Sequence, residues 1–272
     1  MLALLVPVVL AAPPDSAEQP VEPVQVSVMS WNVWGLRWPL SLDRSDRMEG
    51  VPGELEQADV VGLQEAWVGA RRQIDAPLHL PQEQPGDSGL AYAGRLCGAT
   101  TLALFHPFTS RTGIERFKRK GILEAEVLIQ GIPVRVYNTH LQHGPDSDVV
   151  RSEQIGQLLE LLAAHQEPAI VMGDFNFYRD SPVDSETIER MGGAGLRDVA
   201  EELGQQQATF RFDNRYAQRS GLEEGRERFD RVYLRDGAQV AVEPMGVGVV
   251  RYRKQPLSDH QPVLAHIQLV SR

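Results

Sequence analysis

Two alternating segments joined by only two residues constrain the fold of this chain most. Apolar and polar side chains alternate along residues 122–129 and again along 132–139, which is the period of half-buried β-strands. Gln130-Gly131 separates the two segments, and glycine supplies the positive φ that a two-residue hairpin turn needs. The sequence therefore predicts an antiparallel β-hairpin, so the fold must contain a sheet with antiparallel pairing.

The other predicted strands are short and are mixed with helices. Residues 147–165 carry leucine and isoleucine at helical spacing, and residues 48–55 show a helical face that Gly50 and Pro52 would kink or delay. This mixture predicts an α/β fold in which two packed sheets are flanked by helices. The further predicted strands are residues 24–32, 59–64, 100–105, 169–172, 229–234 and 262–269.

Composition indicates an N-terminal segment, residues 1–23, followed by one domain, residues 24–272. The segment begins with the apolar run MLALLVPVVLAA and continues as an acidic, Pro-rich spacer, a pattern typical of a signal peptide and too short to span a bilayer. We therefore expect a secreted or periplasmic protein. The rest of the chain is long enough for one substantial core, since 42% of all residues are hydrophobic. The single cysteine, Cys97, excludes an intramolecular disulfide and a cysteine-based zinc cluster.

The charge of the chain bears on its partners. A net charge of −10 disfavours attraction to nucleic acids, whose binding usually relies on clustered Lys and Arg side chains. A basic run from Arg111 to Lys120 can form either a local nucleic-acid strip or an ordinary solvated edge. We expect the solvated edge, no stable nucleic-acid binding and a monomeric protein.

Eight polar residues fall at the ends of predicted strands, or at the start of one, where a scaffold presents chemical groups. Each alone is a weak signal, because a histidine at a strand end is usually structural, Asn32 can form a turn, and Asp230 can pair with arginine at the surface. The prediction of a site depends on their joint occurrence. The eight residues are Asn32, Glu65, His140, Asp174, Asn176, Asp230, Asp259 and His260.

Three of these side chains suit a divalent cation. Asn32, Glu65 and Asp259 offer oxygen atoms of the kind that Mg²⁺ prefers as ligands, and Mn²⁺ or another divalent cation would accept the same set. Zinc is not expected, because no HExxH motif or cysteine cluster accompanies the histidines. The sequence therefore predicts a magnesium-type site.

The other five side chains can handle protons and phosphate charge. His260 can take a proton from water if Asp230 orients its ring, and His140 can donate to a phosphate oxygen. Asp174 and Asn176 are two residues apart, so on extended backbone both would project to one side, toward the nucleophile and a phosphate oxygen respectively.

The blocks that contain these residues resemble, in order, the signatures of the endonuclease/exonuclease/phosphatase superfamily. The resemblance spans the chain after residue 24 and implies a four-layered α/β sandwich with a divalent-metal site. It implies that Asn32, Glu65 and Asp259 serve the metal and that His140 and Asn176 bind the phosphate. It also implies that Asp174 lies beside the nucleophile and that Asp230 orients His260 as the general base. The blocks are SWNVWG (30–35), LQEAW (63–67), NTHLQ (138–142), GDFN (173–176), FDRVYL (229–234) and LSDHQPV (257–263).

Within that superfamily the chain looks most like the neutral sphingomyelinases, on residues 32–37, 64–67, 120–123 and 139–142. This resemblance implies hydrolysis of a phospholipid, sphingomyelin, to ceramide and phosphocholine at a membrane surface. The acidic composition agrees, since a zwitterionic lipid requires no basic groove. The aromatic residues that can contact a bilayer or lie in the core are Trp31, Trp34, Trp38, Phe105 and Phe108, and we expect Trp31 and Phe105 in the core.

Two alternatives stay open. The first is another enzyme of the same scaffold, a nuclease or a phosphoinositide phosphatase. The phosphatases would be expected to carry Trp-Cys-Asp-Arg where residues 228–231 of this chain read Arg-Phe-Asp-Arg. The second is a non-catalytic binding protein or toxin subunit that keeps the fold, and metal-dependent hydrolysis distinguishes it from an enzyme.

Overall fold

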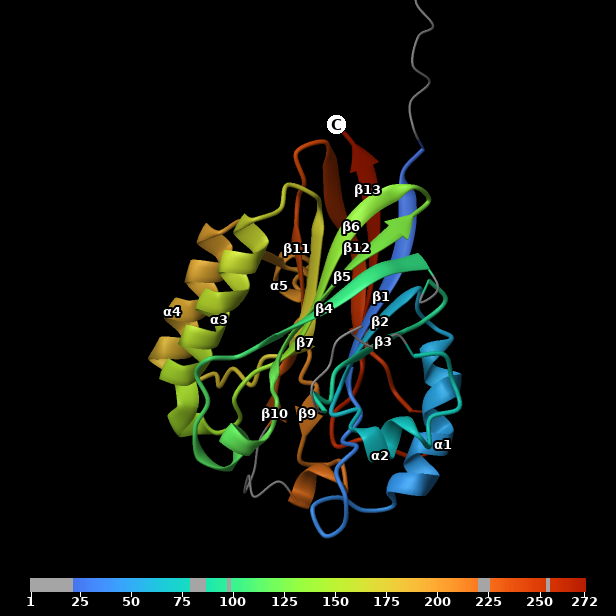
Figure 1. The fold of residues 1–272 in the computed structure, drawn as a ribbon, viewed down its shortest axis with the longest axis vertical. Coiled ribbons are helices and arrows are strands. Elements are labelled where there is room, and N and C mark those ends of the chain that lie inside the picture. Colours follow the sequence, from blue (N-terminus) through green and yellow to red (C-terminus); the bar gives the residue numbers. More distant parts are fainter. Residues whose placement is uncertain (1–21, 79–86, 97–98, 220–225, 253–254) are drawn as a thin grey trace, which may run out of the picture.

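Two β-sheets form the centre of the computed structural model, which describes residues 22–78, 87–96, 99–219, 226–252 and 255–272 (Figure 1). The strands are β1 (Val24–Asn32), β2 (Val60–Gln64), β3 (Ala91–Ala93), β4 (Thr100–Pro107), β5 (Gly121–Ile129), β6 (Ile132–His140), β7 (Ala169–Asp174), β8 (Arg197–Asp198), β9 (Phe210–Arg211), β10 (Arg226–Glu227), β11 (Asp230–Arg235), β12 (Val240–Val249) and β13 (Val263–Ser271). One sheet has the order β12-β13-β1-β2-β3 and the other the order β4-β5-β6-β7-β11-β8, while β9 and β10 form a small ribbon.

Helices cover the outer face of each sheet, which gives four layers (Figure 1). They are α1 (Arg44–Leu55), α2 (Val68–Arg71), α3 (Asp148–Ala163), α4 (Pro182–Gly193) and α5 (Val199–Glu202), with 3-10 turns at Gly113–Phe117, Pro145–Ser147 and Ala217–Arg219. Apolar side chains of both sheets, such as Val28, Ala125 and Ile170, form the core between the sheets. Separate apolar clusters lie under α1 and α2 and under α3 and α4. The prediction of two packed mixed sheets flanked by helices is therefore confirmed.

The predicted hairpin is present as β5 and β6, paired antiparallel from Ile122 opposite Thr139 to Ile129 opposite Ile132. Gln130 and Gly131 both adopt positive φ, of 48° and 86°, so the turn places glutamine as well as glycine in the left-handed region. The same hairpin delivers His140 to the end of β6 that lies beside β7.

Parallel pairing brings the polar strand ends together. β1 runs parallel to β2, with Asn32 opposite Gln64, and β6 runs parallel to β7, with His140 opposite Asp174. β11 is antiparallel to β7, so its first residue, Asp230, also lies opposite Asp174. Residues far apart in the sequence therefore meet at one end of the sandwich.

Some elements differ from the prediction. Helix α1 begins at Arg44, before Gly50, so the delayed start was wrong, and Pro52 lies inside the helix. β12 and α4 were not predicted. β12 contains Pro244 at a bulge, which is tolerated because β12 is an edge strand. Trp31 is buried as expected, whereas Phe105 is only half-buried.

The N-terminal prediction falls mostly outside the described residues. Of the predicted signal peptide and spacer, residues 1–23, only positions 22 and 23 are described. Within the described part of the chain, no helix combines the length and the apolar character that crossing a bilayer requires.

Candidate active site

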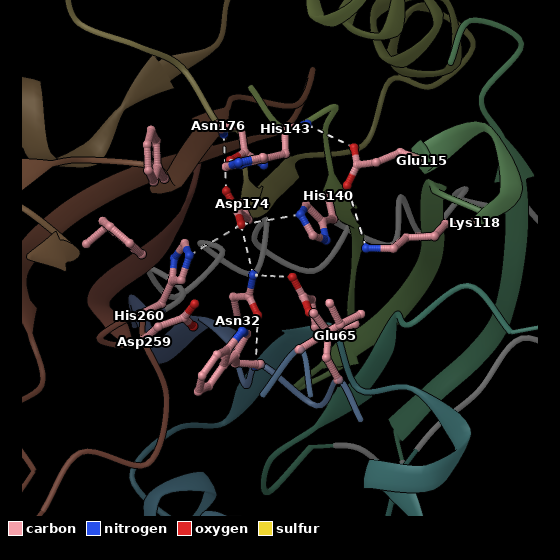
Figure 2. Close-up of a pocket in the computed structure, with 15 residues that line it drawn as sticks. Asn32, Glu65, Glu115, Lys118, His140, His143, Asp174, Asn176, Asp259 and His260 are labelled. Carbon is pink, nitrogen blue, oxygen red and sulfur yellow. Dashed lines mark hydrogen bonds and ion pairs between the residues drawn. The ribbon is translucent and has the colours of Figure 1, made fainter. Parts of the chain in front are cut away.

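A pocket of about 300 Å³ opens where the strand ends meet. Seven of the eight predicted side chains line it, and they come from both sheets and from the loops that follow them (Figure 2). The eighth, Asp230, lies behind the ring of His260 and is hydrogen-bonded to it. The seven lining residues are Asn32, Glu65, His140, Asp174, Asn176, Asp259 and His260.

Asp230 and His260 form a buried pair at the back of the pocket. The distance from His260 Nδ1 to Asp230 Oδ2 is 2.7 Å, and both side chains are at most 7% exposed. Burial opposes a charged ring, but Asp230 and Asp174 outweigh it and raise the pKa of His260 well above its ordinary value. Because Nδ1 is held by Asp230, Nε2 faces the pocket, where it lies 3.8 Å from Asp174 Oδ2. The surface ion pair considered for Asp230 is thus not what the structure forms.

Asp174 occupies the centre of the site. Its Oδ2 accepts a hydrogen bond of 2.9 Å from the Asn32 amide and lies 3.4 Å from His140 Nε2 (Figure 2). Burial raises the pKa of Asp174, and neighbouring Asp230 adds to that rise. This carboxylate therefore touches both halves of the site, the His260 side and the His140 side.

The backbone conformation that places Asn176 in the pocket differs from the predicted one. Its φ is +49°, in the left-handed region, so the expectation of extended backbone through residues 174–176 was wrong. Asp174 Oδ1 accepts from the Asn176 backbone N–H at 3.1 Å, which closes a tight turn, and Phe175 is buried in the core as expected. The turn still presents Asp174 and Asn176 to the same pocket.

Glu65 and Asp259 form the acidic side of the pocket. Glu65 has a φ of +53°, and the chain at Gly35 approaches so closely that a Cβ there would lie 2.3 Å from the Glu65 carbonyl oxygen. Within the described ranges, the Glu65 carboxylate accepts only long hydrogen bonds, of 3.4 Å, from Asn32 Nδ2 and Trp67 Nε1. Burial, reinforced by Glu65, raises the pKa of Asp259 to about 7.

This donor set fits a hard divalent cation. Three buried carboxylates, those of Glu65, Asp174 and Asp259, share one pocket, and a bound cation would relieve their mutual repulsion. Asp174, Asp230 and His260 also bring ligand-type atoms within 4.8 Å of one another. We assign that second group to proton handling, because the 2.7 Å hydrogen bond already uses His260 Nδ1 and an Asp230 oxygen.

Sequence reasoning missed Lys120 and Glu115. The Lys120 side chain is fully buried and donates to Glu115 at 2.8 Å, to the Leu141 carbonyl at 2.7 Å and to His140 Nε2 at 3.0 Å. Since an ammonium can only donate, His140 Nε2 must accept, and the ring proton is on Nδ1. Burial and the charge of Lys120 lower the pKa of His140 well below its ordinary value.

His140 is therefore neutral, and the predicted donation to a phosphate oxygen requires its Nδ1–H. A lysine within a basic run gives no sign in the sequence that it is buried. His143, also missed, lines the pocket with its Nδ1 3.3 Å from the Asn176 side-chain oxygen.

Comparison with known proteins finds a matching family and several proteins of the same fold. The profile of the Endonuclease/Exonuclease/phosphatase family matches residues 29–260. The chain is also similar to tyrosyl-DNA phosphodiesterase 2 (TDP2) of Danio rerio, with 26% identity over 232 residues. The match covers 81% of this chain and 59% of the relative, so the chain spans about three-fifths of the relative's length.

Three solved structures share the fold. D. rerio TDP2 complexed with a single strand DNA product has a TM-score of 0.72 at 23% identity, over 89% of this chain and 98% of that one. Beta toxin from Staphylococcus aureus with bound magnesium ions has a TM-score of 0.69 at 18% identity, over 91% and 100%. Sphingomyelinase C from Streptomyces griseocarneus has a TM-score of 0.63 at 19% identity, over 89% and 99%. These identities are low, so the likeness bears on the fold alone.

Proposed function

Because the chain belongs to the endonuclease/exonuclease/phosphatase family, we propose that it is a divalent-metal-dependent phosphodiesterase with His260 as its general base. One observation carries this proposal: the buried Asp230–His260 pair, whose free Nε2 opens onto a pocket lined by Glu65, Asp174 and Asp259. A cation bound among these carboxylates would offset the negative charge that raises the pKa of His260 and so favour its neutral ring. The neutral imidazole, held in this way, can accept a proton from a water molecule beside the bound phosphate.

The reaction that suits these residues is attack of water on phosphorus. His260 Nε2 accepts one proton from the water while the water oxygen bonds to phosphorus, and the bond from phosphorus to the leaving oxygen breaks. Asp174, 3.8 Å from that nitrogen, holds the second hydrogen of the water and so fixes the direction of attack. Asn176 and the Nδ1–H of His140 donate to phosphate oxygens, where negative charge increases in the transition state.

The residues that would hold the cation are Asn32, Glu65 and Asp259, which line the same pocket as Asp174 and the base. Mg²⁺ is the proposed ion, with Mn²⁺ as a substitute, because every donor is an oxygen. When bound, such an ion stabilises negative charge on the phosphate and on the leaving oxygen. The magnesium ions in the beta toxin structure, which has the same fold, support this choice.

We propose sphingomyelin as the substrate, cleaved to ceramide and phosphocholine. The sequence blocks around Asn32, Glu65 and His140 support it, as does the fold that the chain shares with sphingomyelinase C. The net charge of −10 also favours a zwitterionic lipid over a polyanion. Export to the periplasm or the medium remains part of this proposal, since residues 1–12 are typical of a signal peptide.

A second candidate substrate is a phosphodiester bond in nucleic acid. The 26% identity to tyrosyl-DNA phosphodiesterase 2 favours it, because that similarity extends over 81% of this chain. The two candidates share the same chemistry at phosphorus and differ in what the surface around the pocket binds.

A substrate panel with Mg²⁺ tests both. Sphingomyelin, phosphatidylcholine, plasmid DNA and a phosphoinositide are offered side by side, and we expect phosphocholine release from sphingomyelin to be fastest. His260→Ala should slow it by about 10²- to 10⁴-fold, whereas His266→Ala, at an exposed position on β13, should not. Faster cleavage of DNA would replace the lipid proposal, and full activity of His260→Ala would remove the assigned base.

A further inference from the structure

The most exposed large hydrophobic side chains among the described residues gather on two segments of the chain. Trp38 is 80% exposed, Ile114 78%, Phe117 76% and Leu40 66%. We call these four side chains the apolar rim. Single exposed apolar residues are ordinary, but the four most exposed ones lie within two short segments, 38–40 and 114–117, which makes these segments a candidate interaction surface.

Both segments border the catalytic pocket. Leu36 and Leu40 line it from the loop after β1, and Glu115 in the 3-10 turn Gly113–Phe117 and Lys118 just after that turn line it from the other segment. In Figure 1 the loop after β1 is the blue loop at the lower end of the molecule, and the 3-10 turn is the green one at lower left. The segments that carry the apolar rim therefore reach the edge of the site, and the rim does not lie on a remote face.

The loop that carries Trp38 and Leu40 is held firmly beneath its exposed tip. The buried guanidinium of Arg47 donates to the carbonyl oxygens of Val33, Trp34 and Leu42 at 2.8–3.0 Å. The exposure of this tip is thus a property of an ordered loop and does not arise from loose packing.

The segment that carries Ile114 and Phe117 is held in the same way. Between these two residues, Glu115 turns inward, pairs with buried Lys120 at 2.8 Å and accepts from the His143 backbone N–H at 2.9 Å. With Glu115 anchored inside, its apolar neighbours point outward beside the pocket.

The charge around the apolar rim is opposite to that of the whole chain. Segments 36–42 and 111–119 contain five basic residues and one acidic residue, the buried Glu115, whereas the chain has a net charge of −10. Basic side chains around exposed apolar tips match a layer of phosphate groups above an apolar layer. The five are Arg37, Arg111, Arg116, Lys118 and Arg119.

We propose that the apolar rim inserts into the apolar layer of a phospholipid surface and so holds the catalytic pocket over the headgroup phosphates. A lipid surface fits better than single-stranded nucleic acid, because Leu40 and Ile114 are aliphatic and offer no ring on which a base can stack. This inference rests on the proposed phosphodiesterase function and specifies where its substrate is met.

Vesicle binding tests the proposal. All proteins carry His260→Ala to prevent turnover, and the vesicles contain phosphatidylcholine and sphingomyelin, with Mg²⁺ present. Adding Trp38→Ser, Ile114→Ser and Phe117→Ser together should lower the vesicle partition coefficient by about tenfold or more. Adding instead Met245→Ser, at a 54% exposed position on β12, should leave it unchanged. Equal binding of the triple variant and its parent would overturn the proposal.

Tryptophan fluorescence with brominated acyl chains gives an independent readout. Trp38 is the most exposed of the four tryptophans, since Trp31 and Trp34 are buried and Trp67 is half-buried. Bromine should quench part of the emission of the parent, and Trp38→Phe should remove that quenching while the protein still binds. Quenching that is unchanged in Trp38→Phe would contradict insertion at this loop.

Two further assays distinguish failure of the lipid-docking surface from failure of the proposed phosphodiesterase activity. With His260 intact, the triple variant should hydrolyse the soluble diester bis(p-nitrophenyl) phosphate as fast as the unmodified chain. Hydrolysis of that diester without rim-dependent vesicle binding would refute the docking surface alone, and no hydrolysis would refute the proposed function. If the parent does not bind vesicles but binds an oligonucleotide, and the triple variant loses that binding, the partner of the apolar rim is nucleic acid and the lipid proposal is overturned.

Discussion

Replacing Asp230 by asparagine tests the proton-handling pair directly. The substitution keeps the size of the side chain and its place at the start of β11, but it removes the negative charge that lies 2.7 Å from His260 Nδ1. The structure assigns Asp230 to orienting the ring, so the fold should persist while turnover falls. Asp230 touches His260 and not the substrate, which makes it a positioning residue.

The expected loss follows from the geometry. A charge-assisted hydrogen bond between buried groups contributes about 1.5–3 kcal/mol. At about 1.4 kcal/mol per factor of ten, its loss in the transition state slows turnover by about 10- to 150-fold. Asparagine can also donate its N–H to Nδ1 of His260, which leaves the ring proton on Nε2 and blocks the base. That outcome would raise the loss toward about 10⁴-fold.

The assay is kcat/KM for a soluble diester measured across pH. Because Asp230 helps to raise the pKa of His260, Asp230→Asn should move the acid limb of the profile to lower pH while it lowers the maximum. The control is Asp236→Asn, which breaks a partly exposed ion pair just beyond the other end of β11. An Asp230→Asn variant with unchanged kcat/KM and an unchanged acid limb would refute the assignment of the base.

Three further predictions concern stability and are measured by urea unfolding. Lys120→Met leaves the buried carboxylate of Glu115 without its main partner and should cost about 3–5 kcal/mol, whereas adding Glu115→Gln should recover part of that loss. Gly173→Ala would place a Cβ 2.3 Å from a carbonyl oxygen of β6 and should cost about 1–3 kcal/mol, so an unchanged midpoint would contradict this close approach. Despite burial, the hydrogen bond from His106 holds the pKa of Glu124 below its ordinary value of 4.5. The ionised Glu124 therefore adds to the free energy of unfolding above pH 4.5, and this stabilisation is lost as the pH falls through the lower folded-state pKa. Glu124→Gln should therefore flatten the acid decline in stability, and an equally steep decline would contradict this.

The strands could be predicted because their side-chain pattern matches their burial. Alternation in 122–139 matches the turn end of the hairpin, where Val127 and Ile129 are buried and Leu128 is exposed, although the other end of β5 is buried on both faces. The apolar run before Glu65 reflects a strand buried on both faces. The convergence of distant polar residues could be expected from strand ends alone, and the structure brings Asn32, His140 and Asp174 together as expected.

Features that depend on a local side-chain contact with the backbone, or on tertiary contacts, could not be predicted. The turn at Asn176 replaces extended backbone because Asp174 Oδ1 captures its backbone N–H, an interaction that competes locally with strand geometry. Lys120 looks like surface charge in the sequence, and only packing against Glu115 and His140 shows why it is buried. β12 was missed because Pro244 argues against a strand unless an edge position is known.

The most direct test of the site as a whole is hydrolysis of bis(p-nitrophenyl) phosphate by chelator-treated protein during a titration with Mg²⁺. Joint action of the acidic side of the pocket and His260 predicts no turnover without a divalent ion. Turnover should then rise to a plateau with Mg²⁺, and Glu65→Ala should need a higher concentration to reach half of its plateau. Full turnover of the unmodified chain in the absence of any divalent cation would contradict the account.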